Sequence, residues 1–176
     1  MVTYNSLNIL GGNNLKSKEI TMTTFKEYLA KLSEETALLA MDEYIQHGET
    51  SCFWHSVAVA YYSVRLAKHL GISCDVESLI TGALLHDYFL YDWHIPDKTH
   101  RLHGFTHPNK ALFNAQRDWK VNDIEMDIIR RHMFPLTPIP PMYREGVIVC
   151  IMDKYCSIKE IIQKDPYKRL KMTYAI

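Results

Sequence analysis

Nine histidines occur in this chain of 176 residues, and several of them interrupt stripes of apolar residues at helical spacing. His55, His86 and His132 each follow or precede aliphatic residues by three or four positions, and so do the carboxylates Asp87 and Asp153. Such spacing places these five side chains on faces that should point into a core. Burial of imidazole and carboxylate groups is costly unless they are paired or bound to a metal. The pattern therefore indicates a metal site built from several helices.

Each of these residues has a simpler interpretation when it is taken alone. A single core histidine is more often bonded to a carbonyl group than to a metal. Asp153 could pair with Lys154, Arg130 or Arg131. The convergence of three histidines and two aspartates favours the metal. His107 is a further candidate, because Pro108 after it suggests a helix N-terminus, where the positive end of the helix dipole favours neutral imidazole.

The elements that must carry these residues are helices, and the chain shows no alternating strand pattern. The fold class we predict is all-α, a single-domain bundle of five to seven main helices over residues 22–176, preceded by a polar N-terminal tail over residues 1–21. The predicted helices cover residues 23–46, 53–70, 75–87, 108–119, 122–133 and 142–164. Asp75 and Asn122 are the expected caps of two of them. Residues 88–106 should form a long loop, and 134–141, rich in proline, a rigid connector.

Composition limits the function. Lysine and arginine number 20 and so do aspartate and glutamate, so the chain lacks the basic excess typical of proteins that bind long nucleic acids. The four cysteines form no Cys-x-x-Cys pair, which favours reduced thiols. No signal peptide and no membrane span is evident, and we therefore expect a cytoplasmic protein.

The order His55, His86-Asp87, Asp153 resembles the H…HD…D signature of the HD-domain superfamily of metal-dependent phosphohydrolases. In that superfamily the signature lies on successive helices of an all-α bundle. The resemblance spans residues 47–157 and implies that these four residues bind a first metal ion.

Some members of the superfamily have two further histidines, which complete a second metal site bridged by the aspartate of the HD pair. His107 and His132 occupy those places here, and His103 is the alternative to His107. The His107-Pro108 pair is similar to the His-Pro helix start of HD-GYP phosphodiesterases and to the corresponding histidine of di-iron HD hydrolases. Tyr88-Phe89-Leu90 after the HD pair departs from the Ile-Gly-Lys of HD-GYP proteins and argues against cleavage of cyclic dinucleotides.

The resemblance implies a hydrolase that cleaves phosphoester or phosphoanhydride bonds of a nucleotide or another small phosphorylated metabolite. The expected cofactors are one or two divalent ions of Fe, Mn, Co, Ni or Zn, which would activate a water molecule. Asp87 and His86 are the predicted catalytic residues. Lys154, Arg131 and Lys110 are the predicted substrate-binding residues, although each could equally be a solvated surface cation.

Two other functions fit the same residues. Some HD-fold proteins are oxygenases with a di-iron centre, and such a protein would require iron and consume dioxygen. A non-catalytic module that binds metal or nucleotide is the other alternative. The sequence leaves open the substrate, the number of ions and whether the chain forms a homo-oligomer.

Overall fold

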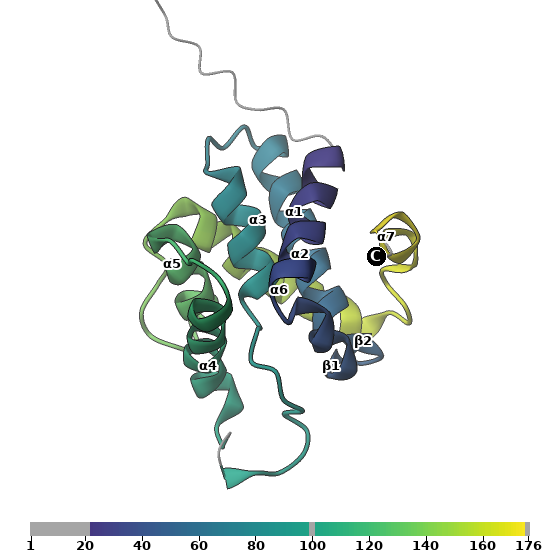
Figure 1. The fold of residues 1–176 in the computed structure, drawn as a ribbon, viewed down its shortest axis with the longest axis vertical. Helices are drawn as coiled ribbons and strands as arrows, with labels where there is room; N and C mark the ends of the chain where they lie inside the picture. Colours follow the sequence, from purple (N-terminus) through teal and green to yellow (C-terminus); the bar gives the residue numbers. More distant parts are fainter. Residues whose placement is uncertain (1–21, 99–100, 175–176) are drawn as a thin grey trace, which may run out of the picture.

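The computed structural model describes residues 22–98 and 101–174, and the predicted tail over residues 1–21 lies outside this range. The described residues form a helical bundle with one two-stranded hairpin (Figure 1). Helix α2 (Cys52–His69) packs against α3 (Val76–Leu85) and α6 (Arg144–Ile162), and α5 (Asp123–Arg131) also contacts α3 and α6. The predicted all-α class is confirmed. None of the described helices combines the length and hydropathy needed to cross a membrane.

The first predicted helix is shorter than the sequence indicated. Helix α1 (Met22–Glu35) ends before Thr36, and a 3-10 helix η1 (Leu38–Glu43) follows. Thr36 ends α1 because its hydroxyl donates to the Leu32 carbonyl at 2.6 Å and accepts from the Leu38 amide at 3.2 Å. A threonine side chain that bonds to nearby backbone in this way competes with helix continuation.

A β-hairpin that the sequence analysis missed follows η1. Strand β1 (Ile45–His47) pairs with β2 (Thr50–Ser51) in antiparallel fashion. Gly48 makes the turn with a positive φ of 57°, which glycine adopts without a steric penalty. Two strands this short leave no alternating pattern to detect. The hairpin matters because it brings residues 46 and 47 to the site described below.

The two helices at the centre of the bundle begin as the sequence predicted. Ser51 caps α2 by accepting from the Trp54 amide, and Asp75 caps α3 by accepting from the Ser78 amide at 3.1 Å. Each cap is worth about 1 kcal/mol. Helix α3 ends at Leu85, ten residues after its cap, so that the predicted site residues His86 and Asp87 lie directly after the end of a buried helix.

Helix α4 (His103–Asp118) begins five residues earlier than predicted. Leu102 precedes it in a left-handed conformation, with φ of 59°, and its carbonyl accepts from the amides of Phe105 and Thr106. Because this start has no Ser, Thr, Asp or Asn cap, it leaves no sequence signal. Pro108 therefore lies inside α4, and His107 is in the second turn instead of at a helix N-terminus.

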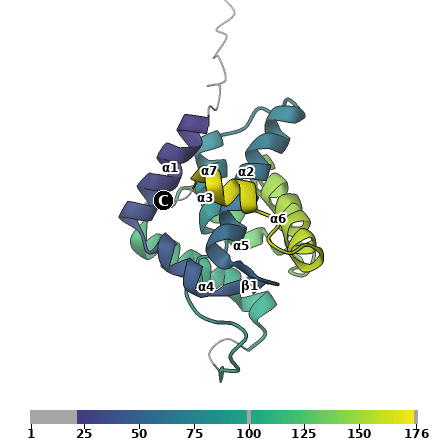
Figure 2. The same cartoon turned by 90° about the vertical axis from the view of Figure 1, so that its right-hand side faces the viewer.

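Helices α5 and α6 frame the other side of the site. Asn122 and Glu125 form the predicted capping box of α5, with reciprocal bonds of 2.9 and 3.0 Å. Residues 132–143 between α5 and α6 contain no helix, as the prolines predicted. A last helix, α7 (Lys168–Tyr174), was not predicted. It packs through the buried side chains of Leu170 and Tyr174, and Figure 2 shows it on the side of the molecule that also carries α1.

Candidate metal centre

The six predicted ligands come from five helices or their ends and meet at one place. His55 lies in the first turn of α2, His107 in α4 and Asp153 in α6. The others follow helix ends: His86 and Asp87 come directly after α3, and His132 directly after α5. All six side chains are buried, with no residue more than 7 % exposed. The sequence prediction of their convergence therefore agrees with the structure.

Asp87 lies at the middle of the cluster, and its two oxygens face different histidines. Oδ1 is 3.1 Å from His107 Nε2 and 3.5 Å from His132 Nε2. Oδ2 is 3.3 Å from His86 Nε2 and 3.7 Å from His55 Nε2. A carboxylate with this placement can bind at two neighbouring metal positions at once, with one oxygen at each.

Asp153 completes one half of the cluster. Its Oδ1 is 3.2 Å from His55 Nε2 and 3.7 Å from His86 Nε2. His55, His86 and Asp153 offer ligand atoms within 4.8 Å of one another, and so do His86, Asp87 and His132. Two overlapping groups of potential ligands therefore share His86.

The hydrogen bonds of the histidines fix which nitrogen faces the centre of the cluster. His86, His107 and His132 each place Nδ1 against a backbone carbonyl of their own helix. These bonds run from His86 to Ala83, from His107 to His103 and from His132 to Ile129, at 2.8, 2.8 and 2.9 Å. A carbonyl oxygen only accepts, so Nδ1 carries the proton and Nε2 is left as the metal-binding atom.

The Nε2 atoms of His107 and His132 are only 2.8 Å apart. With a proton on each Nδ1, two neutral rings would direct lone pairs at one another, and a cation beside them removes that repulsion. His86 Nε2 and Asp87 Oδ1 are also buried without a hydrogen-bond partner. Buried polar atoms are seldom left unsatisfied, which makes this donor set a good fit for metal ions.

Electrostatics keep the carboxylates in the form that binds metal. Burial opposes ionisation of Asp87 and Asp153, but the histidines that face them hold both pKa values well below the usual range. Burial and the nearby His86 lower the pKa of His132 to about 3, so that its imidazole is neutral. Burial also opposes protonation of His86, but Asp87 and Asp153 raise its pKa to about 9. A bound metal would therefore replace a proton on His86.

Three residues that were not predicted support the ligands, either directly or through one another. Glu160 is fully buried, and its oxygens lie 2.9 and 3.0 Å from His55 Nδ1. Tyr167 donates to Glu160 Oε1 at 2.7 Å. Gln46, from the hairpin, donates to Asp87 Oδ2 at 2.6 Å. Only Glu160 left a usable signal, because it follows Asp153 by seven residues and so shares its face of α6.

His103, the alternative to His107, lies one turn earlier on α4. Its ring stacks on the His107 ring, with centroids 4.5 Å apart and planes at 19°. Its Nδ1 is 2.8 Å from the Tyr91 hydroxyl. His107 places its own Nε2 on Asp87 and His132, so the geometry favours His107 as the ligand and His103 as its neighbour in the wall of the site.

A cavity of about 640 Å³ opens onto the cluster. Asp87, His107, His132 and Asp153 form part of its lining. The remaining lining residues come from the hairpin, the loop before α4, the start of α4, the segment after α5, and α6. They are Gln46, His47, Trp93, His103, Gly104, Met133, Pro135, Leu136, Lys154 and Ser157. Four of the six candidate ligands are therefore reached from a cavity.

Of the three predicted substrate-binding cations, Lys154 lines this cavity. Its Nζ donates to the His132 carbonyl at 2.9 Å and lies 3.8 Å from Asp153 Oδ2. Arg131 instead pairs with Asp127 at 3.0 Å, and Lys110 lies over the Tyr91 ring. Neither is among the residues that line the cavity in the described part of the chain. Substrate binding by these three cations stays a prediction.

Comparison with known proteins agrees with this geometry. The sequence model of the HD domain family matches residues 53–158, which include all six predicted ligands. Searches of curated proteins and of solved structures gave no significant match. The matched segment covers more than half of the chain, and it begins in α2 and ends in α6, the helices that carry His55 and Asp153. The chain therefore belongs to the HD domain family.

Proposed function

We propose that this protein is a metal-dependent phosphohydrolase that acts on a small phosphorylated compound. The observation that carries the proposal is the buried cluster in which the Nε2 atoms of His107 and His132 lie 2.8 Å apart beside an unsatisfied oxygen of Asp87. Members of the HD domain family are typically phosphohydrolases of this kind, which supports the same function.

The residues that would hold the ions are the six predicted ligands, with Asp87 between the two halves of the cluster. Divalent ions bound there supply a Lewis acid for phosphate oxygens and lower the pKa of water toward neutrality. The chain itself contributes the fixed orientation of each imidazole through its Nδ1 bond and the ionised state of Asp87 and Asp153. We propose Asp87 and His86 as the catalytic centre, and no side-chain nucleophile is required.

The cavity favours a substrate that carries one phosphate group. Lys154 is the only lysine or arginine among its lining residues in the described part of the chain. A phosphate monoester carries up to two negative charges, and one lysine beside the ligand cluster is suited to it. Met133, Pro135 and Leu136 give part of the lining an apolar character that fits the body of the substrate instead of a chain of further phosphates. A nucleoside monophosphate meets both conditions.

Metal analysis followed by a phosphate-release assay tests this proposal. Natively purified protein should contain one or two transition-metal ions and should hydrolyse a nucleoside monophosphate faster than the matching triphosphate or a cyclic dinucleotide. Asp87→Ala should lose both metal and activity. Metal-loaded protein that hydrolyses none of these compounds would contradict the proposal. Iron-dependent consumption of dioxygen would point to the oxygenase instead, and metal binding without any turnover to a binding module.

A lysine substitution tests the substrate side separately from the metal. Lys154→Met should raise KM about tenfold and leave metal content unchanged, because loss of one charge-assisted hydrogen bond costs about 1.4 kcal/mol. Lys159→Met is the matched control, because Lys159 lies on the same helix but donates to the Tyr62 hydroxyl. An unchanged KM for Lys154→Met would show that Lys154 does not bind the substrate.

A further inference from the structure

The solvent-facing side of α6 carries large apolar side chains where a surface helix would carry charged ones. Five of them form what we call the α6 stripe. Its members are Val147, Ile151, Tyr155, Ile158 and Ile162, with 45, 51, 48, 59 and 74 % of their surface exposed. A surface helix normally has polar residues on the face opposite the core, so an apolar outer face indicates that α6 has further apolar surface to bury.

The stripe is continuous along the helix. Its members follow one another by four, four, three and four residues, which at about 100° per residue keeps them within an arc of about 80°. The acidic residues of α6 lie on other faces and are all buried, namely Glu145, Asp153 and Glu160. Figure 2 shows α6 along one edge of the molecule, with no other labelled element beyond it.

The stripe is large enough to serve as the centre of a protein interface. Five large side chains that are about half exposed present on the order of 500 Å², which is near the upper end for the apolar patches of monomers. The stripe alone therefore supplies more than half of the about 800 Å² that each partner contributes to a standard interface.

We propose that a second copy of this chain covers the α6 stripe, with the two α6 helices antiparallel about a twofold axis. In such a dimer the two residues that face each other across the axis always have residue numbers that add up to the same total. Around an axis next to Tyr155, Val147 faces Ile162 of the partner subunit and Ile151 faces Ile158 of the partner subunit. The stripe is thus complementary to itself in this arrangement.

Charges at the two ends of the helix agree with the same register. Arg144 begins α6 and is exposed. The pairing that joins Val147 to Ile162 of the partner subunit places Arg144 near the C-terminal end of the partner's α6, where the negative end of the helix dipole favours a cation. Antiparallel helices also align their dipoles favourably. Charge and apolar pattern therefore select one occupant, another α6.

The proposed interface lies beside the cavity. Lys154 is one helical turn from both Ile151 and Ile158, and it also lines the cavity. The partner helix would therefore border the cavity mouth of each subunit and exclude solvent around Lys154. This places the dimer interface and the proposed substrate site on neighbouring faces of the same helix.

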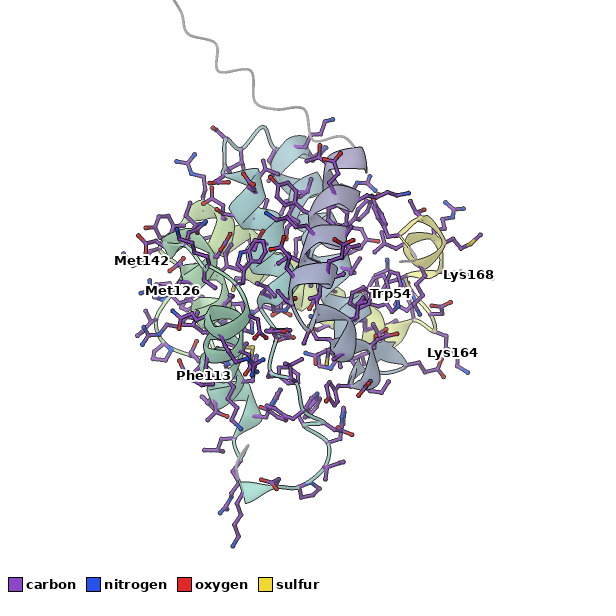
Figure 3. The ribbon with its side chains drawn as sticks, viewed as in Figure 1. Trp54, Phe113, Met126, Met142, Lys164 and Lys168 are labelled. Atoms are coloured by element: carbon purple, nitrogen blue, oxygen red, sulfur yellow. The ribbon has the colours of Figure 1, made fainter. Side chains whose placement is uncertain are left out.

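The oligomeric state of the full chain tests the proposal. Light scattering coupled to gel filtration should give twice the 20.5 kDa of one chain at micromolar concentration. Ile158→Glu should weaken the dimer at least a hundredfold, because it places a carboxylate opposite an apolar side chain, and Ile158→Ser should weaken it less. Phe113→Glu is the matched control: Phe113 is 70 % exposed on α4, away from the stripe, and its loss should leave the dimer intact (Figure 3).

Cysteine cross-linking tests the register. In a Cys74→Ser background, Tyr155→Cys should form a disulfide-linked dimer on mild oxidation, because this position lies next to the axis. Val147→Cys alone should not cross-link, but should do so when it is mixed with Ile162→Cys. Monomeric wild-type protein at 100 µM would overturn the proposal. Binding of the stripe to phosphatidylcholine vesicles without self-association, or efficient cross-linking of Val147→Cys to itself, would overturn it as well.

Discussion

Replacement of Glu160 by glutamine should weaken metal binding without removing a ligand. Glu160 is fully buried, contacts His55 Nδ1 with both oxygens at 2.9 and 3.0 Å, and receives the Tyr167 hydroxyl at 2.7 Å. A carboxylate in this position orients the imidazole and makes its Nε2 a stronger donor to metal. The amide retains one accepting oxygen but loses the charge. Loss of such a partner lowers metal affinity 10- to 100-fold, or about 1.4–2.7 kcal/mol.

The assay is a competition titration of the apo protein with a chromophoric zinc chelator, with thermal unfolding measured in parallel. Glu160→Gln should remain folded and bind the same number of ions more weakly. Tyr167→Phe should have a smaller effect in the same direction, because it removes a single bond to Glu160. Glu125→Gln is the matched control, a buried carboxylate in the α5 capping box, and should leave the affinity unchanged. Unaltered affinity in Glu160→Gln would refute the role of Glu160 in orienting His55.

Three further substitutions test other parts of the structure. His107→Ala should reduce the bound metal toward one ion per chain by elemental analysis, and unchanged stoichiometry would exclude a second position at His107. Burial raises the pKa of Glu125 from 4.5 to about 7. As the pH rises, the Glu125 carboxyl therefore ionises in the unfolded chain before it does so in the folded one, and the free energy of unfolding falls between pH 4.5 and pH 7. Glu125→Gln removes this loss and should raise Tm at pH 8 more than at pH 4.5. Gly82→Ala should lower Tm by several degrees, since the new Cβ would lie 2.5 Å from Ile128 Cδ1, and a higher Tm would show that α3 and α5 separate easily.

The convergence of five of the six candidate ligands could be predicted from the sequence because each of the five interrupts an apolar stripe; His107 was inferred from Pro108, which the structure places inside α4. Asp75 fixes the start of α3, so the position of His86 at its end follows from helical spacing. Asn122 does the same for His132 at the end of α5. In both cases the capping residue fixes where the helix begins, and helical spacing then determines which residues share its apolar face. A polar residue at the far end of that face is therefore expected to be buried.

The supporting residues could not be predicted in the same way. Gln46 reaches Asp87 only because a hairpin of two very short strands turns at Gly48, and no residue pattern marks such strands. The true start of α4 was missed because Leu102 closes the first turn through its backbone and offers no capping side chain. Pro108 was therefore taken for a helix start. Tertiary contacts, which single-sequence patterns do not contain, decide these features.

Side chains from five helices or their ends are proposed to bind metal at one common point. Anomalous diffraction from crystals of the metal-loaded protein, collected at the absorption edge of the bound element, tests it most directly. We expect one or two peaks within bonding distance of Asp87, one of them beside the Nε2 atoms of His107 and His132. An empty cluster in protein that elemental analysis shows to contain metal, or peaks only at surface residues, would contradict the account.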